Sequence, residues 1–171
     1  VAALRLKFQI DGELSWPMLE LNQLQIHLNG EDAFTAPLYE LIHRHALQVV
    51  FRSGENKKNP PVVRTASEVI HPVGFGVDEG LLPYPKRSFP GYRLLTEFFA
   101  YPAKFLYFDL DGFAEAKRTG AQKQLEVFLF LDRTLPRLEQ AVEAGAFLLG
   151  CVPVVNLFEQ IAEPINWTQL K

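Results

Sequence analysis

The sequence has no surplus of positive charge: 17 lysines and arginines stand against 20 acidic residues, for a formal net charge of −3. Nucleic-acid-binding domains carry a basic patch or stripe, so we expect no nucleic-acid partner. Cysteine is almost absent, and the single Cys151 cannot form a disulfide within the chain, which fits a reducing compartment. No apolar run approaches the roughly 18 residues of a membrane span, so we expect no direct membrane insertion.

Aromatic residues, by contrast, are plentiful. The chain contains 14 phenylalanines, 5 tyrosines and 2 tryptophans among 171 residues. Because aromatic side chains carry a large apolar area, they dominate protein cores and protein interfaces alike. In a chain of this length, we expect part of that aromatic surface to be covered by something outside the chain.

Alternation of apolar and polar residues predicts β-strands. The strands expected from this period of two lie at residues 4–10, 24–28, 47–51, 105–110 and 125–131. Helical spacing of apolar residues predicts helices at 34–45 and 92–99, and a third helix is expected after Thr134. The predicted fold class is therefore α+β, with mostly antiparallel β-sheets and a few short helices packed against them.

Two hypotheses about organisation follow from this pattern. The strands at 105–110 and 125–131 are joined by a polar stretch, and we predict that they pair as an antiparallel hairpin. The second hypothesis is a division into two lobes. A β-rich lobe would cover residues 1–73, and a second lobe at 74–171 would hold the helix near residue 92 and the hairpin.

The sharpest enzymatic signal is Asp109-Leu110-Asp111-Gly112 at the end of an apolar strand. This motif resembles the first motif of the haloacid-dehalogenase phosphatases, in which one aspartate attacks phosphorus and the next protonates the leaving group. The chemistry also needs carboxylates on later strands to hold Mg²⁺, and after Asp111 the only further aspartate is Asp132. We therefore favour a plain strand that ends in an Asp-Gly turn, and a magnesium-dependent phosphotransferase that uses Asp109 and Asp111 is the alternative.

The sequence offers no other sign of catalysis, cofactor or metal. The chain has 4 histidines, and none has the spacing of metal ligands. His43 and His45, for example, lie in a predicted helix at positions that point about 200° apart. We expect no cofactor, no metal and no catalytic residue.

The most unusual stretch of the sequence runs from Glu79 to Phe105. Its distinctive parts are Gly80–Pro85 (GLLPYP), Arg87-Ser88-Phe89, Gly91–Leu95 (GYRLL), Glu97 and Pro102-x-Lys104-Phe105. This signature segment resembles the central signature of the TssF (VasA/ImpG) family, a baseplate component of the bacterial type VI secretion system. The stretch from Gly150 to Phe158 also resembles that family. One departure is Ala103, where the family often has an acidic residue.

The resemblance implies what the protein does. Because members of that family are several times longer, this chain would be a middle fragment of a larger protein. The implied function is structural and not enzymatic: TssF-like proteins join TssG-like proteins in wedges around the spike protein, together with TssE-like and TssK-like subunits. The implied location is the cytoplasm, in a complex docked at the inner membrane.

The physical character of the signature segment suggests a contact surface. Prolines at 83, 85 and 90 fix φ and reduce the entropy lost when an irregular segment is held in one shape. Aromatic and arginine side chains are the usual anchors of protein interfaces. The candidate partner-binding residues are Tyr84, Arg87, Phe89, Tyr92 and Arg93. An internal brace packed against its own domain is the other interpretation, and the sequence leaves both open.

Overall fold

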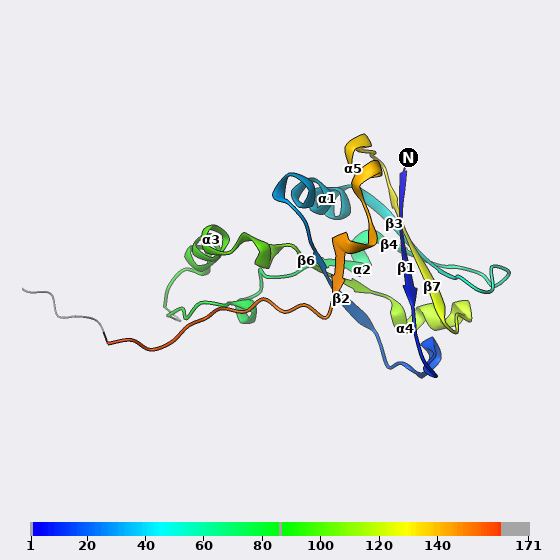
Figure 1. Ribbon diagram of the computed structural model, residues 1–171, viewed down its shortest axis with the longest axis horizontal. Helices are drawn as coiled ribbons and strands as arrows, with labels where there is room; N and C mark the ends of the chain where they lie inside the picture. The colour runs from blue at the N-terminus through cyan, green and yellow to red at the C-terminus, as the bar shows by residue number, and fades with distance from the viewer. Residues whose placement is uncertain (1, 86, 162–171) are drawn as a thin grey trace, which may run out of the picture.

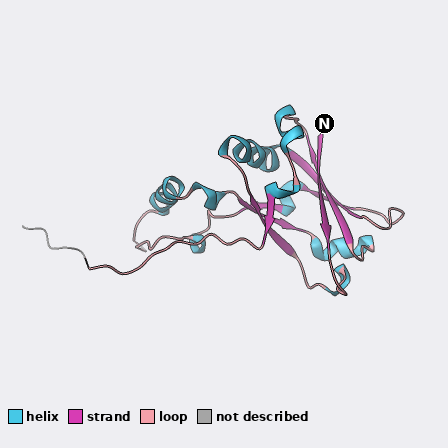
Figure 2. Ribbon diagram, in the orientation of Figure 1, coloured by secondary structure: helices cyan, strands magenta, loops and turns pink. Residues whose placement is uncertain are grey.

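The computed structural model describes residues 2–85 and 87–161, whose strands form two antiparallel sheets of four strands each. The first sheet has the order β1-β7-β3-β4, with strands at Ala2–Gln9, Gln124–Leu131, Ala46–Ser53 and Val62–Thr65 respectively. The second has the order β5-β6-β2-β8, with strands at Ile70–Pro72, Tyr107–Asp111, Gln23–Leu28 and Phe147–Leu149. The predicted α+β class with antiparallel sheets is confirmed (Figure 1, Figure 2).

Short helices connect these strands. The α-helices of the described residues are α1 (Asp32–His45), α2 (Ala66–Val69), α3 (Pro90–Ala100), α4 (Phe113–Ala116) and α5 (Pro136–Ala141). Single 3-10 turns lie at Trp16–Met18, Val77–Glu79, Pro102–Phe105, Lys117–Thr119 and Ala144–Ala146. The apolar spacing in α1 buries Leu38, Leu41 and Ile42, as expected for an amphipathic helix on a core. Within the described ranges, the helices fall short of the length and hydropathy needed to cross a bilayer.

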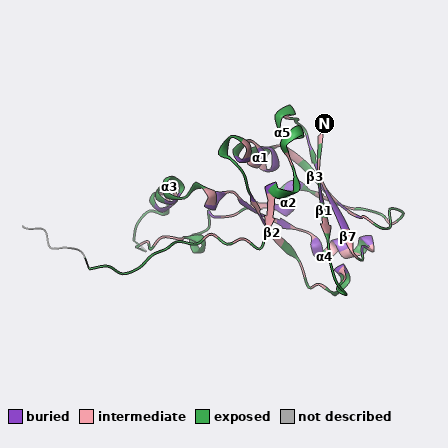
Figure 3. Cartoon of the chain, in the orientation of Figure 1, coloured by how far each residue is buried: buried purple, intermediate pink, exposed green. Residues whose placement is uncertain are grey.

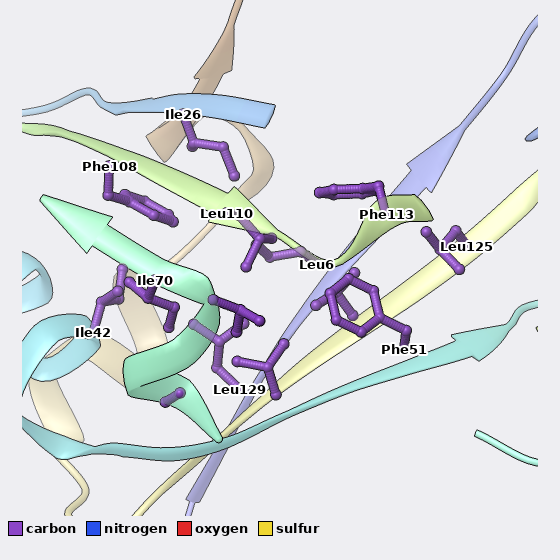
Figure 4. Packing of buried hydrophobic residues seen from close by; sticks show 14 of the residues in the cluster. Leu6, Ile26, Ile42, Phe51, Ile70, Phe108, Leu110, Phe113, Leu125 and Leu129 are labelled. Carbon is purple, nitrogen blue, oxygen red and sulfur yellow. The ribbon is translucent and has the colours of Figure 1, made fainter. Parts of the chain in front are cut away.

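A single hydrophobic core takes side chains from both sheets (Figure 4). Alternate residues of β7, from Leu125 to Leu131, point into this core, and β6 contributes Phe108 and Leu110. Four aromatic rings form one end of it. The ring of Phe113 stacks on Trp16 at 5.9 Å and meets Phe8 and Phe51 edge-on at 5.8 and 5.6 Å.

The predicted hairpin between residues 105–110 and 125–131 is wrong. β6 pairs with β2 and β5 in the second sheet, whereas β7 pairs with β1 and β3 in the first. Both edges of β7 are therefore occupied, and none is left for β6. Between the two strands, Gly112 adopts a left-handed φ of 99° and Phe113 enters the core at the start of α4. The connection that we interpreted as a polar loop carries the chain from one sheet to the other.

Each sheet also mixes strands from before and after residue 73. The first sheet combines β1, β3 and β4 with β7, and the second combines β2 and β5 with β6 and β8. Both sheets therefore span residue 73, and the division into two lobes stays a prediction. α3 and its neighbouring loops lie to one side of the sheets (Figure 1).

Two half-buried histidines lead to a pH prediction. Burial lowers the pKa of His43, whose Nε2 is buried without a hydrogen-bond partner among the described residues, and burial also lowers the pKa of His27. As the pH falls, these two histidines therefore become protonated in the unfolded chain at about pH 6.5, and in the folded chain only at a lower pH. We expect the free energy of unfolding to fall as the pH drops through this value and to level off once the folded-state histidines are also protonated.

Denaturant unfolding at a series of pH values measures this effect. The His43→Leu variant should show a shallower loss of stability between about pH 7 and pH 5, because one of the two responsible groups is gone. A variant with an unchanged pH profile would assign the acid sensitivity to other groups.

Candidate functional site

The two aspartates of the phosphatase-like motif lie on a central antiparallel strand. Asp109 accepts a hydrogen bond from Gln25 Nε2 at 3.2 Å, and Asp111 Oδ2 lies 3.3 Å from His71 Nε2. Burial raises the pKa of Asp109, and the nearby charge of Asp111 adds to that rise, although the bond from Gln25 opposes it. In residues 2–85 and 87–161, no three His, Cys, Asp or Glu side chains gather in a way that could hold a metal ion. The geometry gives both aspartates contacts between neighbouring strands of the second sheet.

The signature segment has a different character, and its helix α3 is reversed relative to an ordinary amphipathic helix. The buried residues of α3 are its two charged ones, Arg93 and Glu97, at 6% and 1% exposure. Four of its large apolar residues are exposed, namely Tyr92, Leu95, Phe98 and Phe99, and Leu94 is half-buried. Figure 3 shows exposed positions around α3, well away from the buried strands of the sheets. The charged side of α3 therefore holds it to its own chain, and the aromatic side faces outward.

Arg93 fixes the turn that precedes the signature segment. Its Nη1 donates to the carbonyl of Val77 at 2.6 Å, and its Nη2 donates to the carbonyl of Gly76 at 2.7 Å. Gly80 passes so close to the guanidinium that an added Cβ would lie 2.6 Å from Nη1. A side chain at residue 80 would therefore displace Arg93, which explains why the turn needs glycine there.

Glu97 fixes the next part of the segment. One of its oxygens, Oε1, accepts hydrogen bonds from the backbone amides of Leu81 and Leu82 at 2.8 and 3.0 Å. The other, Oε2, forms an ion pair with Lys104, whose side chain is only 2% exposed. Burial alone would raise the pKa of Glu97, but the bonds from Leu82, Lys104 and Leu81 together lower it below its ordinary value. The carboxylate thus stays charged and ties the loop, α3 and the following 3-10 turn together.

The five candidate partner-binding residues lie in three different environments. Arg93 is buried and bonds within the chain. Tyr84 is half-buried, and its hydroxyl donates to the carbonyl of Phe89 at 2.6 Å, just before the first residue of α3. Arg87 is exposed, as are Phe89 and Tyr92 at 69% and 65%, and the rings of the last two meet edge-to-face at 5.9 Å. The brace and the outward surface are therefore different side chains of one segment.

Helical spacing places Tyr92, Leu95, Phe98 and Phe99 on one side of α3, but sequence reasoning did not predict that this side is exposed. Leu95, Phe98 and Phe99 belong with Tyr92 and Phe89 on the outside, and we call these five residues the aromatic face. A signal was present in the sequence: in the 11 residues of α3 the only charges are Arg93 and Glu97. If Arg93 and Glu97 both bind the backbone of the neighbouring loop, the opposite side of the helix, which carries the apolar residues, must face away from the rest of the chain.

An apolar groove continues from this face toward α1. It has a volume of about 400 Å³, and its walls include Phe75, Phe98 and Phe105 on one side and Ala36 and Tyr39 of α1 on the other. The ring of Phe105 contacts both Phe75 and Phe98, at centroid distances of 5.0 and 5.8 Å. The aromatic face and the groove together form a surface that suits apolar side chains of a protein partner.

Comparison with known proteins decides the family. The family described as "Type VI secretion system, TssF" matches residues 1–171, the whole chain. The chain belongs to the TssF family. It is 32% identical over 165 residues to the type VI secretion system component TssF1 of Pseudomonas aeruginosa, a match that covers 96% of this chain and 26% of that protein. The resemblance seen in the signature segment is thus confirmed.

A solved structure supports the fold. The chain is similar to a chain in the cryo-electron microscopy structure of the type VI secretion system TssK-TssF-TssG baseplate subcomplex, with a TM-score of 0.73 and 24% identity. The match covers 98% of this chain and 31% of that chain. Our TssF segment therefore spans between a quarter and a third of the length of the relatives it matches.

Proposed function

We propose that this chain is part of a structural TssF subunit of the type VI secretion baseplate, which acts through protein–protein contacts and carries no catalytic site. Its partners would be TssG-like, TssK-like and TssE-like subunits and the spike protein. The assembly would lie in the cytoplasm, docked at the inner membrane. Membership of the TssF family supports this proposal, and the observation that carries it furthest is the uncharged aromatic face of α3.

The aromatic face has the properties of a protein contact. Phe99 is 81% exposed, and the face carries no charge because both charged residues of α3 point inward. Clustered, exposed aromatic side chains on one element are typical of interface centres, where a few such residues supply most of the binding energy. A partner that covers this face with apolar side chains would remove that surface from water without burying an unpaired charge.

The brace prepares this face for binding. Arg93, Glu97 and Lys104 hold the helix and the proline-rich loop through contacts within the chain. Because the segment is already ordered, association would cost less conformational entropy than binding through a flexible loop. We propose that the TssF signature combines an internal brace with a contact surface for a TssG-like subunit.

The double variant Tyr92→Ala/Phe99→Ala in full-length TssF tests this proposal. We expect it to weaken co-purification with the TssG-like subunit by a few kcal/mol in binding free energy, the usual scale for hot-spot residues. The melting temperature of TssF alone should barely change, since both side chains are exposed. The measurements are co-purification and thermal melting of the same preparation.

Leu14→Ala/Met18→Ala is the matched control, because these side chains are also exposed, at 54% and 67%, but lie near the first 3-10 turn. This control should bind the TssG-like subunit normally. A Tyr92→Ala/Phe99→Ala protein that binds normally but melts early would show that the aromatic face packs against another part of TssF itself.

A further inference from the structure

The first sheet ends in a long unpaired edge. β1 pairs with β7 on one side, and in the part of the chain that the structure describes no strand lies along its other side. Ile10 continues the register and donates its amide to Lys123 at 3.0 Å. Since hydrogen-bonded pairs alternate in an antiparallel ladder, the even-numbered amides of β1 point to β7. The amides of Arg5 and Lys7 therefore point to the free edge.

An apolar groove lies beside this edge. It has a volume of about 350 Å³ and separates the inward side chains of β1 from the end of the second sheet. Its apolar lining includes Leu4, Leu6 and Phe8 on the β1 side and Ile26, Phe147 and Leu149 on the other. β8, which carries the last two, is the edge strand of the second sheet and has only 3 residues. The two sheets share one core, but on this side their edge strands β1 and β8 are separated by the groove.

The outward side of β1 carries an excess of positive charge. Arg5 and Lys7 are exposed, and Arg5 forms an ion pair with Glu126 at 3.9 Å. Glu126 already accepts two hydrogen bonds from Arg52, at 2.5 and 3.1 Å. One acidic group is therefore shared by two arginines, and Lys7 lies opposite it in the register of β1 and β7.

An edge of this kind is rarely left bare in a folded protein. β1 has 8 residues, contains no proline, and pairs with β7 residue by residue without a bulge. Long, regular edges are templates for pairing with other chains, and proteins protect them with bulges, prolines or charged side chains, or cover them. β1 has neither proline nor bulge, and Arg5 and Lys7 are its only charged residues. This segment accounts for only 26% of the length of TssF1, so most of such a protein lies outside it and could supply the cover.

We propose that, in the full-length protein, a strand from outside these 171 residues adds to the free edge of β1. Its inward side chains are apolar and fill the groove between β1 and β8. Its outward side chains are acidic and lie beside Arg5 and Lys7. The occupant belongs to the same polypeptide, so this contact completes the TssF fold and is independent of the aromatic face.

Residue-resolved amide hydrogen exchange on purified full-length TssF, without partner subunits, tests this inference. We expect the amides of Arg5 and Lys7 to be protected to a degree similar to that of Leu6, which points to β7. Rapid exchange at Arg5 and Lys7 in TssF alone and in the baseplate complex would overturn the proposal. Protection that arises only after a partner subunit is added, or only at high TssF concentration, would also overturn it and assign the edge to that partner or to a second copy.

The Lys7→Pro variant provides a second test of the proposed strand. Proline removes the edge-facing amide but leaves the ladder to β7 intact, and Leu6 already has the extended backbone that a following proline requires. We expect exchange at Arg5 to rise by about tenfold or more in the full-length variant while Leu6 keeps its protection. Lys7→Ala, which also loses the lysine charge but keeps the amide, is the matched control and should retain most of the protection at Arg5. Equal exchange at Arg5 in the two variants would contradict a strand paired at this edge.

Discussion

Replacing Lys104 with methionine is expected to lower the free energy of unfolding by about 3–5 kcal/mol, the cost of leaving a buried partner charge uncompensated. The pair of Lys104 and Glu97 is 2% and 1% exposed, so water cannot replace the lost ammonium group. Glu97 would keep its hydrogen bonds from Leu81 and Leu82 but lose its counter-charge. Denaturant unfolding of the variant measures the loss.

The double variant Lys104→Met/Glu97→Gln shows whether the loss of stability comes from the uncompensated charge of Glu97 or from the changed shape of residue 104. Its glutamine carbonyl can still accept the two backbone amides while neither partner of the pair is charged, so most of the lost stability should return. The exposed pair of Glu40 and Arg44 in α1, 4.0 Å apart, is the matched control: Arg44→Met should change stability by less than about 0.5 kcal/mol. If Lys104→Met were as mild as Arg44→Met, the buried pair would not be what holds α3 in place.

Phe113→Ala should also destabilise the protein by about 3–5 kcal/mol, the usual cost of removing a buried phenylalanine ring. Phe113 is 2% exposed and contacts the rings of Trp16, Phe8 and Phe51. Its removal would leave a cavity among three rings that are too rigid to fill it. Thermal or denaturant unfolding gives the value directly.

The contrast with Phe99→Ala makes this result informative. Phe99 is 81% exposed, so its truncation should change the stability of this segment by less than about 0.5 kcal/mol. The two phenylalanines thus separate the core from the proposed contact surface. Equal effects of the two variants would mean that Phe99 is covered in the protein as tested.

How far the sequence could predict the fold depends on what each pattern encodes. A period of two reports which face of a strand is buried, and so residues 4–10, 24–28 and 125–131 were correctly predicted as strands. The same period says nothing about the neighbour of a strand. β6 and β7 are close in the chain and strongly apolar, but the positive φ of Gly112 and the burial of Phe113 send the chain to the other sheet.

The candidate site shows a similar limit. The signature segment carried the resemblance to the TssF family, which the family match confirms, whereas its role as a contact surface stays a prediction. Its orientation was not predictable from helical spacing, which assumes that the apolar side of a helix faces its own core. The irregular loop before α3 needs a hydrogen-bond acceptor for the backbone amides of Leu81 and Leu82. The Glu97 carboxylate accepts both bonds, and this places the charged side of α3 inward.

The pairing of β1 with β7 has a consequence for synthesis on the ribosome. β1 ends at Gln9, and its only described partner strand ends at Leu131, so the first sheet cannot close until 122 further residues have been made. At bacterial rates of about 5–20 residues per second, that takes roughly 6–24 s. During this interval the inward side chains of β1, including Leu4, Leu6 and Phe8, lack the neighbouring strand β7. The first strand of the chain is therefore among the last parts of the first sheet to be covered, and we expect it to need protection from aggregation until then.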